Sequence, residues 1–221
     1  MSYDLHLGDC LQLMKAIPDG SVDSILTDPP YKLSQEYGTG ADADNLLAVS
    51  GIWPAAQEMF RLAKPGSICV MYYDTRILPL ALDAMRSAGW RYLRNLTFYR
   101  RWGNASVVHG WMSTSDFILV FAKPGAKPVY YGKTKHDVLV REAPEKESTG
   151  HPAQKPIEDL RHLAVKVTPP SGIVLDPWMG SGSGGVACAL EGLRFIGMEQ
   201  NPEYFAIAQG RIETAHLGDL I

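Results

Sequence analysis

Segments with the pattern of buried strands alternate along the chain with segments that have the pattern of helices. The predicted strands span residues 22–27, 67–73, 91–99, 117–121, 173–176 and 195–199, and the predicted helices span residues 46–62, 76–88, 156–167, 184–191 and 202–215. Pro54 lies inside the first of these helices and predicts that it is broken or starts late. Strands and helices that alternate in this way favour a mostly parallel sheet covered by helices on both faces.

The last predicted helix, which ends near Ala215, is not followed by the strand that a doubly wound unit requires. Residues 5–9 at the opposite terminus have the pattern of such a strand, and we expect them to fill its place. This arrangement brings the two termini close together. A length of 221 residues suits one compact domain with insertions, so we expect a single domain over residues 1–221.

Two stretches do not fit the alternation. Residues 32–45 are polar and glycine-rich and directly follow a strand end, whereas residues 123–150 are irregular and rich in Lys, Pro and Glu. Ligands of open α/β sheets lie beyond the carboxyl ends of the strands, so residues 32–45 are a candidate active-site lid loop. Ordinary surface loops are the alternative for both stretches.

The composition excludes several classes of protein. Apolar residues make up 46% of the chain and charged residues 20%, which is incompatible with wholesale disorder. No apolar run approaches the ~18–20 residues of a membrane span, and the first residues do not resemble a signal peptide. We therefore expect a soluble cytoplasmic protein that does not associate with a membrane. The three cysteines are far apart and the six histidines lack metal-binding spacing, so we expect no disulfide framework and no metal.

A glycine-rich turn follows the predicted strand at residues 173–176 and precedes a predicted helix. Gly180, Gly182 and Gly185 satisfy the G-x-G-x-x-G spacing of turns that approach a nucleotide closely, although such turns also occur where a helix simply packs on a strand. The next strand ends in Glu199, whose carboxylate is suited to accept hydrogen bonds from two ribose hydroxyls. Together these features indicate a nucleoside-containing cofactor.

The pair Asp176-Pro177 narrows the choice of cofactor. A carboxylate at the strand end, ahead of the glycines, suits a cationic or amino-bearing group. A pyrophosphate needs amide donors instead. The local chemistry therefore favours S-adenosylmethionine over a dinucleotide.

A second motif, Asp28-Pro29-Pro30-Tyr31, stands at the end of the predicted strand at residues 22–27. The two prolines fix φ and remove amide donors, so the Asp28 carboxylate and the Pro29 carbonyl form a rigid pair of acceptors. Such a pair suits the two hydrogens of an exocyclic amine and localises the nitrogen lone pair for attack on an electrophilic methyl group. Tyr31 offers an aromatic face on which a flipped-out base can stack. A Pro-Pro turn with a partly buried tyrosine is the alternative.

With these motifs in this order, nearly the whole chain resembles the S-adenosylmethionine-dependent DNA amino-methyltransferases in their circularly permuted β-type arrangement. In that family the catalytic turn lies near the N-terminus and the cofactor loop near the C-terminus, as they do here. The resemblance implies a Rossmann-like, doubly wound α/β fold with a mostly parallel seven-stranded sheet and an antiparallel edge hairpin. It also implies methyl transfer to the N6 amine of adenine in double-stranded DNA, by base flipping and direct transfer, with N4 of cytosine as the alternative.

The resemblance assigns roles to particular residues. The catalytic residues are Asp28, Pro29, Pro30 and Tyr31, and the cofactor-binding residues are Asp9, Gln154, Lys155, Asp176, Pro177, Gly180, Gly182, Ser183 and Glu199. Among the latter, Asp9 contacts the cofactor adenine, and Gln154 and Lys155 lie near the cofactor carboxylate. The sequence departs from the family pattern at Trp178, where Phe is usual, and at Ser183, where Thr is frequent.

A basic segment supplies candidate contacts to DNA. Between Arg91 and Lys135, eight Lys and Arg residues stand against Asp116 alone, a local charge of +7 in a chain with a net charge of −3. Aromatic residues are interleaved with them, and this combination suits phosphates and displaced bases. The candidate DNA-binding residues are Arg100, Arg101, Lys133 and Lys135, with a solvated basic face as the alternative. Residues 123–150 are a short candidate target-recognition insertion.

Two functions from other classes remain open. An NAD-type oxidoreductase built on the Gly180 turn leaves the Asp28-Pro29-Pro30-Tyr31 turn without a role, and a non-catalytic DNA-binding module does not explain why that turn is intact. The resemblance also leaves open a homodimer and a companion restriction endonuclease as further partners.

Overall fold

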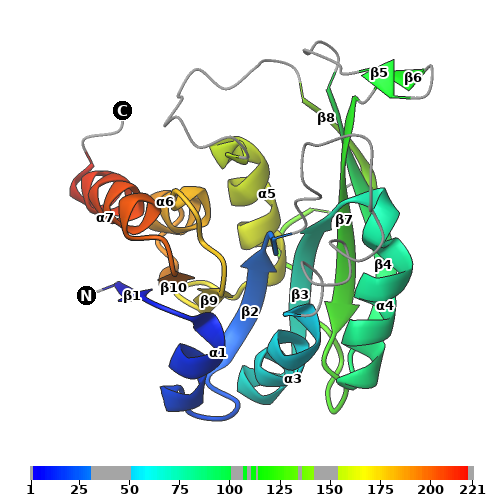
Figure 1. Ribbon diagram of the computed structural model, residues 1–221, viewed down its shortest axis with the longest axis horizontal. Coiled ribbons are helices and arrows are strands. Elements are labelled where there is room, and N and C mark those ends of the chain that lie inside the picture. Colours follow the sequence, from blue (N-terminus) through cyan, green and yellow to red (C-terminus); the bar gives the residue numbers. More distant parts are fainter. Residues whose placement is uncertain are drawn as a thin grey trace, which may run out of the picture.

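The computed structural model describes residues 2–30, 51–100, 107–108, 111–112, 114–133, 136–141 and 154–218. Over these residues the chain forms a twisted sheet with helices on both faces, which is the doubly wound α/β arrangement that the alternation predicts (Figure 1). Within this part of the chain, no helix combines the length and the apolar character that crossing a membrane requires.

Eight strands of the described residues form the main sheet. In spatial order they are β1 (Tyr3–Leu7), β10 (Arg194–Glu199), β9 (Ile173–Asp176), β2 (Val22–Thr27), β3 (Ala63–Tyr73), β7 (Ser115–Ala122), β4 (Arg91–Arg100) and β8 (Val138–Arg141). Neighbouring strands are parallel except where β7 pairs with β3 and β4. A separate ribbon pairs β5 (Val107–Val108) with β6 (Trp111–Met112).

The helices are divided between the two faces of the sheet. On one face lie α5 (Ile157–Val167), α6 (Ser183–Leu190) and α7 (Pro202–Leu217), and on the other lie α1 (Cys10–Leu13), α3 (Ile52–Leu62) and α4 (Leu78–Ser87). Two short 3-10 turns, η1 (Met14–Ala16) and η2 (Thr75–Ile77), follow α1 and precede α4.

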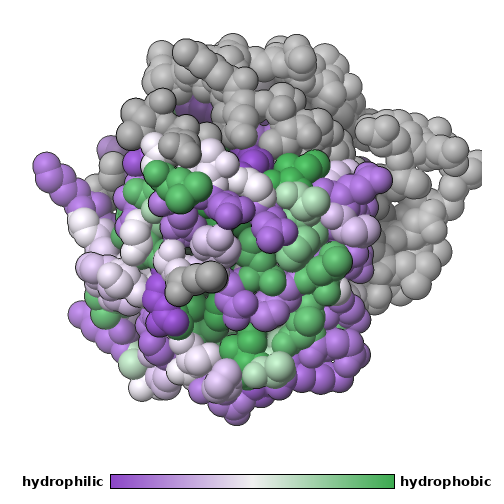
Figure 2. Space-filling model, turned by 90° about the vertical axis from the view of Figure 1, so that its left-hand side faces the viewer, coloured by the Kyte–Doolittle hydropathy of each residue, from purple (hydrophilic) through white to green (hydrophobic). Residues whose placement is uncertain are grey.

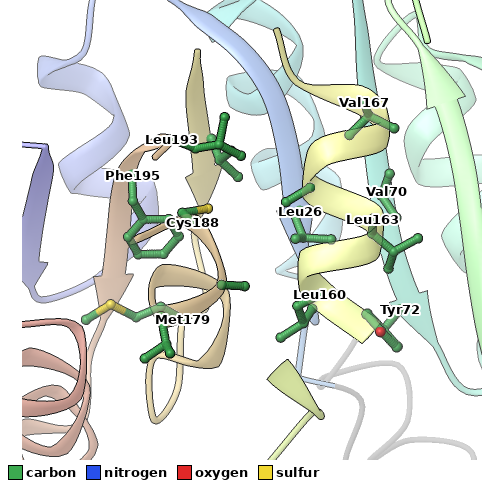
Figure 3. Packing of buried hydrophobic residues seen from close by; sticks show 14 of the residues in the cluster. Leu26, Val70, Tyr72, Leu160, Leu163, Val167, Met179, Cys188, Leu193 and Phe195 are labelled. Atoms are coloured by element: carbon green, nitrogen blue, oxygen red, sulfur yellow. The ribbon is translucent and has the colours of Figure 1, made fainter. Parts of the chain in front are cut away.

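Side chains of the central strands alternate between two hydrophobic cores. Leu26 of β2 and Val70 of β3 point toward α5, where they pack with Leu163 (Figure 3). Ile25 and Cys69 point to the opposite face and join the core beneath α3. Because both faces are covered, Ile25 and Leu26 of β2 and residues 68–73 of β3 are buried, which explains why the sequence pattern locates these strands well.

The sheet differs from the predicted one in two respects. It has eight strands in the described part of the chain rather than seven, because β8 forms within the stretch expected to be irregular and pairs in parallel with β4. The antiparallel pair of successive sheet strands, β4 and β7, lies one strand in from the edge, because β8 pairs with the outer side of β4. Arg141 anchors β8, since its guanidinium donates to Asp116 Oδ2 at 3.0 Å and to the Asp159 carboxylate of α5.

Local chemistry accounts for three shifted boundaries. The first strand ends at Leu7 rather than residue 9, because Asp9 caps α1 by accepting a hydrogen bond of 2.9 Å from the amide of Leu11. The helix expected from residue 76 begins at Leu78, since Pro79 is tolerated only in the first helical turn. Pro54 likewise lies in the first turn of α3, and residues 46–50 of the helix predicted there lie outside the described residues.

The predicted place of the N-terminal strand is confirmed. β1 lies parallel to β10 at the edge of the sheet, and α7 lies close to it (Figure 1). Near the two termini, the Ser2 hydroxyl lies 3.1 Å from His216 Nδ1, and the Tyr3 and His216 rings stack with centroids 4.8 Å apart. The face of the molecule that carries these elements mixes hydrophilic residues with smaller hydrophobic areas (Figure 2).

Two helical glycines are expected to respond oppositely to alanine. A Cβ at Gly185 in α6 would lie 2.3 Å from Ile212 Cδ1, whereas a Cβ at Gly210 in α7 meets nothing within 4 Å. We expect Gly185→Ala to lower the free energy of unfolding by about 1–3 kcal/mol through overpacking. Gly210→Ala should raise it by about 0.5–1 kcal/mol through helix propensity. Urea denaturation of both variants checks the pair, and equal effects of the same sign would contradict this packing.

Candidate active site

A cavity of about 450 Å³ opens where five parallel strands end. Its lining comes from the turns after β1, β2, β9 and β10, from Tyr72 of β3, and from the segment that precedes α5. Such a position, beyond the carboxyl ends of the strands, is where open α/β sheets bind ligands. Topology therefore gathers residues that lie more than 140 positions apart in the sequence, as the contact between Thr27 and Asp176 shows.

Most of the site residues predicted from the sequence lie around this one cavity. Asp9, Asp28, Pro29, Pro30, Gln154, Lys155, Asp176, Pro177, Gly180, Ser183 and Glu199 line it. Gly182 is not among the lining residues of the cavity. Its φ is 82°, and a Cβ there would lie 2.8 Å from Ala208 Cβ. Tyr31 and the candidate lid at residues 32–45 lie outside the described residues.

A carboxylate in the turn after β2 forms an ion pair with an ammonium from a distant segment of the chain. Asp28 Oδ2 accepts a hydrogen bond from Lys155 Nζ, which reaches it from the segment just before α5. The same ammonium lies 5.1 Å from the centroid of the Tyr72 ring. The second carboxylate oxygen, Asp28 Oδ1, is buried and accepts no hydrogen bond from the described residues. Asp28 is therefore oriented by one direct ionic contact.

Asp176 is the most deeply buried acid of the cavity, with 6% of its surface exposed. Its Oδ1 accepts hydrogen bonds from the Thr27 hydroxyl at 2.7 Å and from the Trp178 amide at 3.1 Å. Burial nevertheless raises the pKa of Asp176 to about 7, and the nearby carboxylates of Asp28 and Glu199 add to the increase. The carboxylate therefore lacks a compensating positive charge, and a cationic ligand would provide one.

The glycine turn is tied to the end of the next strand. Glu199 Oε2 accepts a hydrogen bond of 3.1 Å from the Gly180 amide, and Oε1 accepts one of 2.8 Å from the Asn201 amide. A carboxylate has about four acceptor positions, so Glu199 retains capacity for further donors such as hydroxyls. The two turns are thus held together before any ligand is bound.

Known proteins match this chain over most of its length. The family model N6_N4_Mtase, described as DNA methylase, matches residues 22–210. YubD of Escherichia coli (strain K12) is 31% identical over 213 residues, which cover 93% of this chain and 88% of YubD. The chain belongs to the N6/N4 DNA methylase family. It is a DNA methyltransferase that uses S-adenosylmethionine (SAM), as the resemblance of its sequence implied.

Solved structures share the fold of this methylase. The M1.HpyAVI–SAM complex superposes with a TM-score of 0.78 at 24% identity, covering 95% of this chain and 98% of that one. The PvuII DNA methyltransferase, described as cytosine-N4-specific, superposes with a TM-score of 0.80 at 17% identity, covering 95% of this chain and 86% of that one.

The residues of the methylase cavity fit SAM. Its volume of about 450 Å³ falls in the usual range of small-molecule sites. The buried carboxylate of Asp176 suits a cation, and the free acceptor positions of Glu199 suit hydroxyl donors such as those of a ribose. A Cβ at Gly184 would lie 3.3 Å from Asp176 Oδ2, so the glycine lets the start of α6 lie close to this carboxylate.

Sequence reasoning missed two polar residues of the cavity, Thr27 and Tyr72. Thr27 holds Asp176, and Tyr72 is fully buried with a hydroxyl that has no hydrogen-bond partner among the described residues. Burial and the carboxylates of Asp159, Asp116 and Asp28 raise the pKa of Tyr72 well above its usual value. In the sequence both residues look like ordinary members of buried strands. Both residues reach the cavity because the register of β2 and β3 pairs Thr27 with Met71, which directly precedes Tyr72.

Two of the four predicted DNA-binding residues belong to the described part of the chain, and neither lines the cavity. Arg100 and Lys133 are not among its lining residues, and Arg101 and Lys135 fall outside the described part of the chain. Arg100 Nη1 lies 3.7 Å from Asp116 Oδ1, and Arg94 pairs at 3.1 Å with Asp137, just beyond the basic segment counted in the sequence. Asp116 and Asp137 therefore neutralise part of the positive charge of this basic segment.

The buried acid predicts a pH-dependent stability. Because the pKa of Asp176 is raised from 3.8 to about 7, folding favours its protonated form. That stabilisation is complete below about pH 4 and is lost as the pH rises through 7. Asn carries no charge, so Asp176→Asn should gain about 2 kcal/mol relative to the native ligand-free protein between pH 5 and pH 8.

Thermal melts of both proteins at these two pH values, at constant ionic strength, check this expectation. Asp83→Asn, on the exposed face of α4, is the control for the loss of an acidic charge. A difference in melting temperature between Asp176→Asn and the native protein that stays the same at pH 5 and pH 8 would contradict it.

Proposed function

We propose that this methylase transfers a methyl group from SAM to the N6 amine of adenine in double-stranded DNA, after the base has flipped out of the duplex. One observation carries the proposal: Asp28 and Pro29 line the same cavity as Asp176 and Glu199. The acceptor pair for an amine and the candidate cofactor residues therefore share one pocket, as direct transfer requires.

The acceptor pair is the chemical centre of the proposal. The Asp28 carboxylate and the Pro29 carbonyl accept the two hydrogens of the target amine and draw its nitrogen toward tetrahedral geometry. The lone pair, otherwise delocalised into the ring, then points at the reacting carbon. Tyr31 stacks on the flipped base, and residues 32–45 close over it. No covalent bond between the enzyme and the base is needed.

On the cofactor side, Asp176 binds the amino group, Glu199 binds the ribose, and Asp9 contacts the adenine. Gly180, Gly182 and Ser183 form the turn around the methionine part. SAM supplies an electrophilic methyl group on a sulfonium when it is bound. The raised pKa of Asp176 supports this assignment, since a buried carboxylate without a counter-charge is a favourable place for a cation.

The choice of adenine rests on the residue that opens the catalytic turn. In the resembling family, Asp at this position favours adenine and Ser favours cytosine, and here it is Asp28. N4 of cytosine is the second candidate, because its amine offers the same pair of hydrogens and the PvuII enzyme of similar fold is described as cytosine-N4-specific. An NAD-type oxidoreductase would leave Asp28 in the cavity without a function.

One experiment decides between these candidates. The protein is incubated with unmethylated bacterial DNA and SAM labelled in the methyl group, and the DNA is digested to nucleosides. Labelled N6-methyldeoxyadenosine supports the proposal, labelled N4-methyldeoxycytidine supports the second candidate, and no label in DNA overturns both. A homodimer and a companion restriction endonuclease stay predictions.

Removing the Asp28 carboxylate is expected to lower the rate of methyl transfer without weakening the binding of SAM. Asp28→Ala should lower the methyl-transfer rate at least about 10²-fold, because the target amine loses its anionic acceptor. Calorimetric titration should show a SAM Kd within about threefold of the native value. Asp83→Ala on α4 controls for the exchange of an aspartate, and full activity in Asp28→Ala would remove this residue from the mechanism.

Charge reversal is expected to weaken DNA binding through the phosphates. In the double variant Arg100→Glu/Arg101→Glu, the Kd for a duplex should rise, and the slope of log Kd against log salt should become shallower by about 2. Fluorescence anisotropy at several salt concentrations measures both quantities. An unchanged Kd at low and moderate salt would exclude these arginines from the interface.

A further inference from the structure

We propose that Lys155 is a positioning residue that orients the catalytic carboxylate of Asp28 and supplies its counter-charge. In this role it is not a ligand of the cofactor carboxylate. This inference rests on the proposed function, because it assigns a task to Lys155 within the same reaction. The resemblance of the sequence implies the other role, which is contact with the methionine carboxylate of SAM. The two roles predict different defects when Lys155 is changed.

The first observation is the direct contact. Lys155 Nζ donates a hydrogen bond to Asp28 Oδ2 across 127 positions of sequence. Both side chains are largely shielded, with 15% of Lys155 and 24% of Asp28 exposed. Asp28 Oδ1 has no partner among the described residues, so Lys155 is the group that sets the orientation of this carboxylate. Asp28 also lines the cavity, so part of this residue borders the space that a target amine would enter.

The second observation is the surface against which the ammonium rests. Lys155 Nζ lies 5.1 Å from the centroid of the Tyr72 ring, which is fully buried in β3 next to β2. An ammonium is attracted to the face of an aromatic ring. Pro156 follows immediately and caps α5, so the backbone that carries Lys155 is anchored at the start of a helix. The lysine is therefore held at Asp28 from two sides.

The third observation is the negative charge around the pair. The negative charge of Asp28 acts on Asp176 of β9 and helps to raise its pKa, while Asp159 on α5 and Asp116 on β7 act on the neighbouring Tyr72. Glu199 on β10 lines the same cavity. Arg141 on β8 forms ion pairs with Asp116 and Asp159. Without Lys155, the charged side chains that line the cavity beside Asp28 would all be acids. A protonated carboxyl becomes a donor and loses its ability to attract the target amine.

Three variants test the proposal on the full-length protein. Lys155→Met removes the charge and keeps much of the volume, and Lys155→Arg keeps the charge. Lys64→Met is the matched control, because Lys64 makes a similar ion pair with Asp23 at 2.5 Å, outside the cavity lining. Single-turnover methyl-transfer rates between pH 5.5 and pH 9 and calorimetric SAM Kd values are measured for each, together with melting temperatures.

For Lys155→Met we expect a rate about 10–100-fold lower at pH 7 and an acid limb of the rate profile at least about one pH unit higher. Its SAM Kd should stay within about threefold of the native value. Lys155→Arg should restore the native position of the acid limb, and Lys64→Met should leave both the profile and the Kd unchanged.

Two results overturn the inference. One is a SAM Kd raised tenfold or more in Lys155→Met without a shift of the acid limb, which assigns the lysine to the cofactor. The other is a profile and Kd like those of the native protein. Either result leaves the proposed function intact, because native protein still labels DNA. Absence of labelled nucleoside with native protein is the separate outcome that removes the proposed function itself.

Discussion

Two carboxylates share one poorly solvated corner of this methylase, and much of the candidate active site follows from how each is compensated. Asp28 follows β2, and Asp176 is the last residue of the neighbouring strand β9. Asp176 receives hydrogen bonds from the neutral Thr27 hydroxyl and a backbone amide, whereas Asp28 receives the ammonium of Lys155. Burial raises the pKa of Asp176 more than the hydrogen bonds from these neutral donors lower it, so this acid suits a cationic ligand. Beside Asp28, the ammonium of Lys155 instead supplies a counter-charge and holds one carboxylate oxygen. Different partners in this buried corner thus give two aspartate side chains different chemistry.

The same corner is preorganised by backbone contacts. The Glu199 carboxylate accepts hydrogen bonds from the Gly180 amide in one turn and from the Asn201 amide in the next, so the ends of β9 and β10 keep a fixed relation. Gly182 approaches α7 so closely that a Cβ there would lie 2.8 Å from Ala208 Cβ. A ligand that enters this cavity meets turns already held in place, and little ordering of the backbone has to accompany binding.

Much of the fold was predictable because its central strands are buried on both faces. The segments at residues 22–27 and 173–176 correspond to β2 and β9 with unchanged bounds, since their consecutive apolar residues are buried on opposite faces of the sheet. β8 escaped prediction because Val138 and Val140 stand at an exposed edge, in a segment rich in lysine and proline. Its place depends on the contacts of Arg141 with Asp116 and Asp159, which lie 25 and 18 positions away. Distant ion pairs of this kind leave no local periodicity.

The amino-acid sequence alone determined the local chemistry of the site. Asp28 beside two prolines and Asp176 ahead of the glycine turn can be recognised from a few consecutive residues, because their geometry is set by φ restrictions and by missing side chains. Only the tertiary structure decided that Lys155 contacts Asp28, that Tyr72 lies beneath that ammonium, and that Thr27 bonds to Asp176. These contacts arise from strand order and register, which bring distant segments together to bury both faces of the sheet.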